Sequence, residues 1–287
     1  MRTLLSDAHR GHPGLYRLAA AMAVLALVTA GLAVVDPRTL AGAPLWFKPM
    51  KFSISIALYA LALAWMLGQL RERAMRRTGW AIVAGLVVEM VIIVGQAARG
   101  EKSHFNTDGG VGTLLFSVMG ATIAVVWFLT LAIALRFLRE PGRDRAMALA
   151  IRLGLLVSLV GMAVGFVLAA NGGHSVGVPD GGPGLFFVGW STTGGDLRIS
   201  HFVGLHALQV LPLLAALLAQ RSVDGDLRTR IVWSVGVGYL GVVVLLTWQA
   251  LRAQPLFAPD AITVGALGVV VLAALAALPP RGRVLVG

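Results

Sequence analysis

The feature that most constrains this chain is a series of apolar blocks, each about 20 residues long, separated by short charged or glycine-rich segments. An α-helix of that length rises about 1.5 Å per residue and so crosses the roughly 30 Å hydrocarbon core of a membrane. The 287 residues are 57% hydrophobic and only 13% charged, well below the charged share of a soluble domain. We therefore predict an all-α, polytopic integral membrane protein that forms a single transmembrane helical domain in contact with membrane lipid. The eight expected spans are about 15–35, 49–69, 79–98, 112–137, 148–170, 201–220, 229–252 and 260–279.

Basic residues fall in alternate connections between these spans and predict the orientation of the chain. Seven of the 24 lysines and arginines lie on one side, and the other 17 lie on the side that carries both termini. By the positive-inside rule, the side rich in lysine and arginine is cytoplasmic. We expect the protein in the plasma (inner) membrane of a bacterium, with both termini in the cytoplasm. The basic segments are "RERAMRR" (71–77), "RFLREPGRDR" (136–145), "RSVDGDLRTR" (221–230) and "RGR" (281–283).

Several function classes are excluded by composition. The net charge of +11 does not indicate nucleic-acid binding, because the basic residues lie between apolar spans rather than on one soluble face. The chain has no cysteine, which excludes disulfides, thiolate metal sites and haem attached through cysteine. It also lacks a phosphate-binding glycine loop, an HExxH motif and a GxSxG motif.

The longest connection, residues 171–200, lies on the outer side and is dense in glycine and proline, which argues against a helix of its own. It also carries the apolar run "LFFV" at 185–188. Long loops with such a run usually pack against the protein. We expect this loop to fold back over the outer mouth of the bundle as a lid.

Four histidines map to the outer third of the protein: His104, His174, His201 and His206. Neutral imidazole is the commonest protein ligand for metals, and a histidine at membrane depth usually faces a partner, a cavity or a cofactor. On the sixth span, His201 and His206 are about 140° apart, whereas His206 and Gln209 share a face. We expect His206 to point into the bundle and bind a cofactor beside Gln209.

Structural roles for these histidines are the alternative, since a transmembrane histidine can simply hydrogen-bond to a neighbouring helix. We expect His201 to lie at the rim of the bundle, just after Ser200, a residue type favoured at helix N-caps. There it would bond to Asp196 or to the loop. His9 and His12 lie in the N-terminal tail, where we expect no special role.

Glu89 lies near the middle of the third span, where an ionised carboxylate is costly unless it is paired. Gln96 lies two turns further along the same face, and the stripe leads towards Arg99, Glu101 and His104. We predict that Glu89 and Gln96 form a proton or ion path, or lie beside a quinone or a cofactor propionate. The structural alternative is a neutral Glu89 that bonds to a helix carbonyl.

Lys48 and Lys51 open the second span on the outer side, where positive charge is otherwise sparse. They could bind a lipid headgroup, a propionate or an anionic substrate. Snorkelling of the two amines to the membrane interface explains them equally well. Trp46, Trp190 and Trp248 near the same interface fit an ordinary aromatic belt.

The Glu-x-x-His pattern of "GEKSH" (100–104), in an outer loop of an eight-span chain, resembles haem A synthase. The resemblance covers five residues and the number of spans. The two-fold repeat of that family, with histidines in both halves, is missing here, so the chain is not assigned to the family.

The first interpretation of these residues is a redox or electron-transfer protein with haem b in its outer half, or with a single His-bound metal ion such as Zn, Cu or Fe. His206 would be one ligand, and His104 or His174 the other. Glu89 and Gln96 would handle protons for a quinone or for another redox membrane protein.

Three other interpretations stay open. In a proton-coupled transporter or channel, Glu89 would carry a proton and Lys48 or Lys51 would attract an anion. In a membrane hydrolase, three histidines would hold zinc and a carboxylate would activate water. A scaffold subunit would have no chemistry. The zinc ligands would be His104, His174 and His201, with Asp196 or Asp180 as the base.

Overall fold

The computed structural model describes residues 2–70, 72–107, 109–140, 142 and 144–278. These residues are mostly helical, with two short antiparallel strand pairs. Seven of the helices are long and apolar enough to cross a membrane. This result confirms the predicted all-α, polytopic membrane protein.

The helix boundaries agree with the expected spans to within six residues. The helices are α1 (Arg2–Gly11), α2 (Pro13–Val35), α3 (Phe47–Leu67), α4 (Arg73–Ala98), α5 (Gly110–Arg139), α6 (Arg145–Asn171), α7 (Leu197–Gln220), α8 (Gly225–Leu251) and α9 (Ala261–Ala276). The strands are β1 (Thr39–Leu40), β2 (Ala43–Pro44), β3 (Ser175–Val176) and β4 (Gly195–Asp196). α9 has 16 residues, about 24 Å of helix, and is shorter than the seven spans. Position 279, the expected end of the eighth span, lies outside the described residues.

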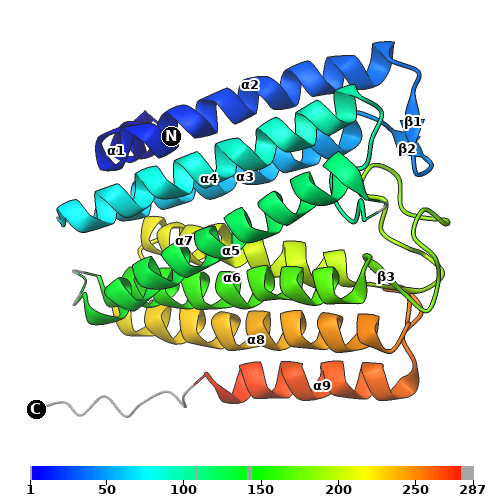
Figure 1. The fold of residues 1–287 in the computed structure, drawn as a ribbon. Coiled ribbons are helices and arrows are strands. Elements are labelled where there is room, and N and C mark those ends of the chain that lie inside the picture. Colours follow the sequence, from blue (N-terminus) through cyan, green and yellow to red (C-terminus); the bar gives the residue numbers. More distant parts are fainter. Residues whose placement is uncertain (1, 71, 108, 141, 143, 279–287) are drawn as a thin grey trace, which may run out of the picture.

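The helices form two halves, α1 to α5 and α6 to α9 (Figure 1). The main contacts between the halves are α5 against α6 and α3 against α7. We call the end of the bundle that carries α1 and the start of α4 the basic end, and the opposite end, with all four strands, the loop end. α5 lies close to α6 at the basic end and diverges from it towards the loop end (Figure 1).

An apolar core joins the two halves near the basic end. It includes Ile133 and Phe137 of α5 and Ile151 and Leu155 of α6, all of them buried. Towards the loop end, α6 and α7 approach closely because Gly161 faces Gly204: a Cβ added to Gly161 would lie 2.5 Å from the carbonyl carbon of Gly204. This contact fixes the rotation of α7 and therefore decides which of its polar residues face the other half.

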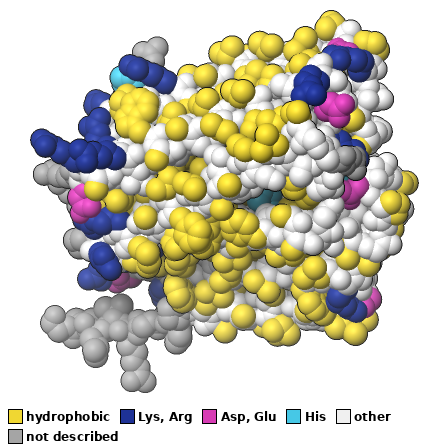
Figure 2. Space-filling view, viewed as in Figure 1, with side chains coloured by type: hydrophobic (Ala, Val, Ile, Leu, Met, Phe, Trp, Pro, Cys, Tyr) yellow, Lys and Arg dark blue, Asp and Glu magenta, His cyan; other side chains and the backbone are white. Residues whose placement is uncertain are grey.

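The surface fits a membrane-embedded protein. Hydrophobic side chains cover the middle of the molecule, and Lys and Arg side chains gather at the basic end (Figure 2). The same view shows a histidine in a hollow near the middle of this face. Large apolar side chains such as Leu27 and Val34 are mostly exposed, as lipid-facing residues would be.

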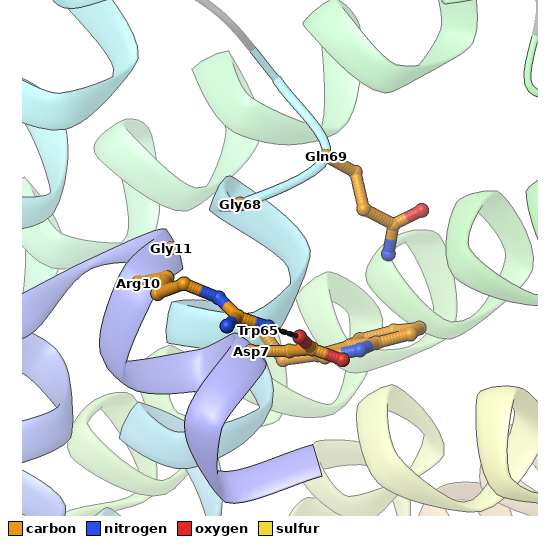
Figure 3. Close-up of a pocket in the computed structure, with 6 residues that line it drawn as sticks. All are labelled: Asp7, Arg10, Gly11, Trp65, Gly68 and Gln69. Carbon is orange, nitrogen blue, oxygen red and sulfur yellow. Dashed lines mark hydrogen bonds and ion pairs between the residues drawn. The ribbon is translucent and has the colours of Figure 1, made fainter. Parts of the chain in front are cut away.

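The N-terminal residues form helix α1, which the sequence analysis did not anticipate. α1 packs against the basic end of α3, where Gly11 fits directly over the carbonyl oxygen of Ala64. A small pocket of about 250 Å³ lies at this contact, between the Asp7–Arg10 ion pair and Trp65 (Figure 3). α1 therefore packs over the basic end of α3.

His12, expected to have no special role, joins α2 to α4. It is fully buried and serves as the N-cap of α2, its Nδ1 accepting a hydrogen bond from the backbone N–H of Leu15 at 3.1 Å. Its Nε2 donates to the carbonyl oxygen of Arg76 at 2.9 Å. Burial lowers the pKa of His12, which keeps the ring neutral and both bonds intact at pH 7.

Helix α7 begins at Leu197, four residues earlier than expected. Its N-cap is Asp196, whose Oδ1 accepts a hydrogen bond from the backbone N–H of Arg198 at 3.0 Å. The expectation that Ser200 caps this helix is wrong: Ser200 lies inside α7 and is buried. The sequence predicts residues 197–200 to be part of the loop, because the connection that precedes them is dense in glycine. In the structure these four residues form the first turn of α7.

The long loop folds back onto the start of α3, as its apolar run predicted. β3 pairs with β4, and a bridge joins Gly184 to Ser191. The ring of Phe47 in α3 contacts the rings of Phe186 and Phe187, with centroids 5.9 and 5.3 Å apart. Phe186 is still 88% exposed, so the loop packs against α3 without burying its whole apolar run.

Candidate functional site

The connection between α4 and α5 turns inward and carries the first part of the site. Its shape depends on Gly100, Gly109 and Gly110, which have positive φ angles of 76°, 94° and 62°. The side chain of Gln96 holds it by donating to the carbonyl oxygen of Lys102 at 3.1 Å. Gln96, predicted to share a proton path with Glu89, therefore positions this inward segment.

Glu89 lies in α4, where its side chain faces His104 of this inward segment. The carboxylate is nine residues, about 13 Å of helix, from the end of α4 at Ala98. The residue is only 3% exposed. Its Oε1 lies 3.6 Å from Nε2 of His104, and its Oε2 is buried with no hydrogen-bond partner among the described residues. A carboxyl group in such surroundings changes its charge only together with its neighbours.

His104 lies in an aromatic environment. Its ring centroid is 5.3 Å from that of Phe52 and 6.2 Å from that of Phe116. Its Nδ1 lies 3.2 Å from Oγ of Ser103. Burial lowers the pKa of His104 well below its usual value, and the positive charge of Lys48 acts in the same direction. His104 is therefore neutral at pH 7 and can accept a proton only at a cost.

His201 reaches the same region from the other half of the protein. The expected bond to Asp196 or to the loop is wrong: the Nδ1–H of His201 donates to the carbonyl oxygen of Gly161 in α6 at 2.7 Å. This bond fixes the tautomer and leaves Nε2 unprotonated. His201 also interacts electrostatically with His104. His104 and His201 thus lie near each other where the two halves face each other.

Three basic side chains lie above this group, at the loop end. Lys48 and Lys51 are in the first turns of α3, and Arg198 is in the first turn of α7. Arg198 forms a bidentate ion pair with Asp196 and also donates to the carbonyl oxygen of Gly189. Lys51 donates to the carbonyl oxygen of Val188 at 3.0 Å.

His174 and the two candidate bases lie further out, in the loop. Nδ1 of His174 is 3.1 Å from Asp180 and 3.9 Å from Asp196. Burial, and next the charge of Arg198, lower the pKa of His174 to about 4, although both carboxylates act in the opposite direction. Asp180 accepts bonds from the backbone N–H groups of His174 and Ser175, so it holds the turn that follows β3 back against the start of that strand.

His206 and Gln209 lie on a different face of α7. His206 is two residues after Gly204 and so points roughly opposite to the α6 contact. It is half-buried, and it interacts with Gln209 and with His201. Gln209 Oε1 is buried without a hydrogen-bond partner among the described residues.

The structure therefore sorts the predicted residues into three groups. Glu89, His104, His201 and Lys48 converge between the halves, His174 belongs to the outer loop, and His206 lies with Gln209. Within the described part of the chain, no set of three or more His, Asp or Glu side chains is arranged to hold one metal ion. Arg198 was missed by sequence reasoning; its position two residues after an Asp that caps a helix was the available signal.

No known family model, curated protein or solved structure matches this chain. The proposal for the function therefore rests on the geometry of the site.

Proposed function

We propose that this protein is a proton-coupled transporter in which Glu89 and His104 carry the proton. The observation that carries the proposal is the buried Glu89–His104 pair, 3.6 Å apart, with one carboxylate oxygen left without a partner. Isolated carboxylates at membrane depth are rare, and those that occur mark proton or ion pathways. Most buried side-chain polar atoms, in contrast, have at least one hydrogen-bond partner.

Proton exchange within the pair needs no other group. In the tautomer whose Nδ1–H donates to Ser103, Nε2 of His104 faces Glu89 as an acceptor. A protonated Glu89 can pass its proton to Nε2, which leaves a carboxylate beside an imidazolium. The exchange requires the inward segment to move by well under 1 Å, because a hydrogen bond spans about 3 Å.

The position of the pair suits alternating access. It lies where the two halves face each other at the loop end, and the apolar core of α5 and α6 separates it from the basic end. Transporters commonly bind substrate and coupling ion between two helix groups that rock against each other. In such a motion, the apolar core between α5 and α6 would part to open the site towards the basic end while the loop end closes.

The charge distribution suggests that the basic end is cytoplasmic. A cysteine in place of exposed Thr107 or Thr193, at the loop end, should react with an impermeant thiol reagent added to intact cells. Cysteines in place of exposed Arg77 or Asp226, at the basic end, should react only after the membrane is permeabilised. The opposite labelling pattern would reverse the proposed orientation.

Transport is tested in proteoliposomes that contain a pH-sensitive dye, with carboxylates, amines and sugars added in turn. At least one solute class should move protons with the wild type, and Glu89→Gln and His104→Gln should abolish the movement. Glu101→Gln removes an exposed carboxyl at the same end and should have no effect. The proposal is wrong if no solute moves more protons than in empty liposomes, or if Glu89→Gln behaves as wild type.

A redox function is the second candidate, and it is supported by His201. Its Nδ1–H donates to a backbone carbonyl, and its Nε2 has no hydrogen bond to the described residues, which is the usual arrangement of a histidine that ligates haem iron or a metal. His104 fits this role less well, because its Nε2 faces Glu89 and its Nδ1 faces Ser103. An absorption spectrum and metal content that are lost in His201→Ala, but not in His9→Ala, would favour this candidate.

A further inference from the structure

Two helices begin at the loop end with positive charge in their first turns. α3 starts with Lys48 and Lys51 near its N-terminus, without an acidic residue in its first turn and without a side-chain cap from Trp46. α7 starts with Arg198. The N-terminus of a helix carries partial positive charge, so lysine there is destabilising unless something negative lies nearby. Lysine and arginine side chains at these two helix starts therefore destabilise the helices unless a negative group lies nearby.

Among the described residues, only Asp196 and Glu89 place negative charge near these three side chains. Asp196 is fully engaged by Arg198 and by the backbone N–H of Ser191. Lys51 is bonded only to a carbonyl oxygen, and Lys48 has no hydrogen bond or ion pair among the described residues. The charges of Lys48, Lys51 and Arg198 repel one another. Lys48 and Lys51 are therefore left without a carboxylate in direct contact, in partly buried surroundings.

Aromatic rings line the same place. The Lys51 ammonium lies 5.9 Å from the ring centroid of Phe187, which in turn packs against Phe47. Phe52, one residue after Lys51, leads down to His104. A ligand here would meet positive charge at one end and aromatic surface at the other.

We propose that Lys48 and Lys51 bind the oxyanion of a small amphipathic carboxylate, with Arg198 adding to the positive potential. The inference rests on the proposed transport function, because it names the substrate class that moves with the proton. Lys48 also attracts ionised Glu89. An anion bound to Lys48 weakens that attraction, so anion and proton favour each other's binding, as reciprocal linkage requires.

The same chemistry occurs in two sources, a soluble carboxylate and the headgroup of an anionic phospholipid. Benzoate represents the first, since it joins a carboxylate to an aromatic ring, and phosphatidylglycerol represents the second. The test is the thermal stability of the purified full chain in a neutral detergent, because a ligand that binds the folded state raises the melting temperature. Sodium chloride at equal ionic strength serves as the blank for screening.

Benzoate should raise the melting temperature of the wild type. Lys48→Gln and Lys51→Gln should each weaken the apparent affinity about tenfold or more, as expected when a charge-assisted contact is lost. Lys48→Arg should retain binding. Lys102→Gln removes an exposed lysine at the same end and should not change it. An effect of phosphatidylglycerol alone, equally dependent on Lys48 and Lys51, would support the oxyanion site and assign it to lipid.

The proposal is overturned if neither probe shifts the melting temperature beyond the chloride blank, or if Lys48→Gln and Lys51→Gln bind as the wild type does. These outcomes are distinct from failure of the transport proposal. If amines or sugars, but not carboxylates, move protons in a Glu89-dependent way, the proton function stands and the anion site does not.

Discussion

Replacing Glu89 by methionine is expected to stabilise the protein while abolishing proton movement. Glu89 is 3% exposed, and its Oε2 has no partner among the described residues. A buried polar group without a partner costs about 1–3 kcal/mol, and methionine removes that cost while filling a similar volume with a flexible apolar chain. The lost attraction to Lys48 offsets part of the gain. The net gain in the free energy of unfolding should be about 1 kcal/mol, the low end of that range.

The assay is thermal unfolding of the purified protein in detergent, followed by tryptophan fluorescence. For chains of about this size, 1 kcal/mol corresponds to about 2–4 °C in melting temperature. Leu86→Met is the matched control, because Leu86 lies one turn earlier on α4 and is 5% exposed. This exchange of one apolar side chain for another should not raise the melting temperature. Glu89→Gln keeps a polar group in place and should give a smaller rise than Glu89→Met.

A loss of about 1 kcal/mol or more in Glu89→Met would refute the reasoning, because it would mean that the carboxyl group makes hydrogen bonds on which the fold depends. Loss of function together with a gain of stability is, in contrast, what replacement of a functional polar residue produces. The experiment therefore separates the functional interpretation of Glu89 from the structural one, a neutral carboxyl bonded to a helix carbonyl.

Three further predictions concern the scaffold around the site. His12→Ala should cost about 2–3 kcal/mol in chemical denaturation, the sum of an N-cap and a buried hydrogen bond. His174 has a pKa of about 4 in the folded protein against about 6.5 when unfolded, so the unfolded state binds the proton first. The stability that neutral His174 contributes is complete above pH 6.5 and is lost as the pH falls towards 4. His174→Gln should therefore weaken the dependence of the melting temperature on pH over that range. Gly161→Ala should destabilise by about 1–3 kcal/mol, because its methyl group would collide with Gly204, whereas Gly120→Ala, which meets nothing within 4 Å, should not.

The spans were predictable because one physical quantity, the length of an apolar block against the thickness of a membrane, dominates each of them. Shorter elements lack that signal. α1 has ten residues and no apolar block, although Leu4, Leu5 and Ala8 repeat with helical spacing. The start of α2 has a clearer signal in the sequence, because proline is favoured in the first turn of a helix and Pro13 directly follows the N-cap residue His12.

The site was predictable only along single helices. Spacing placed Glu89 and Gln96 on a stripe leading to His104, and the structure places His104 within 3.6 Å of Glu89. Spacing could also show that His201 and His206 face different directions. It could not show which of them faces the other half, because that depends on the close contact of Gly161 with Gly204 across two helices.

Lys48 connects the two proposals, since it lies between the loop-end cations and the Glu89–His104 pair. Without an anion, its charge favours ionised Glu89 and disfavours a proton on His104. A bound anion weakens the effect of Lys48 on both Glu89 and His104, so that the pair takes up a proton more easily. The negative charge of the anion and the positive charge of the proton then cancel, and the net charge of the site does not change. An anion and a proton entering together keep the buried charge constant, which is the least costly way to move either through low-dielectric surroundings. The arrangement therefore favours joint transport over movement of the proton alone.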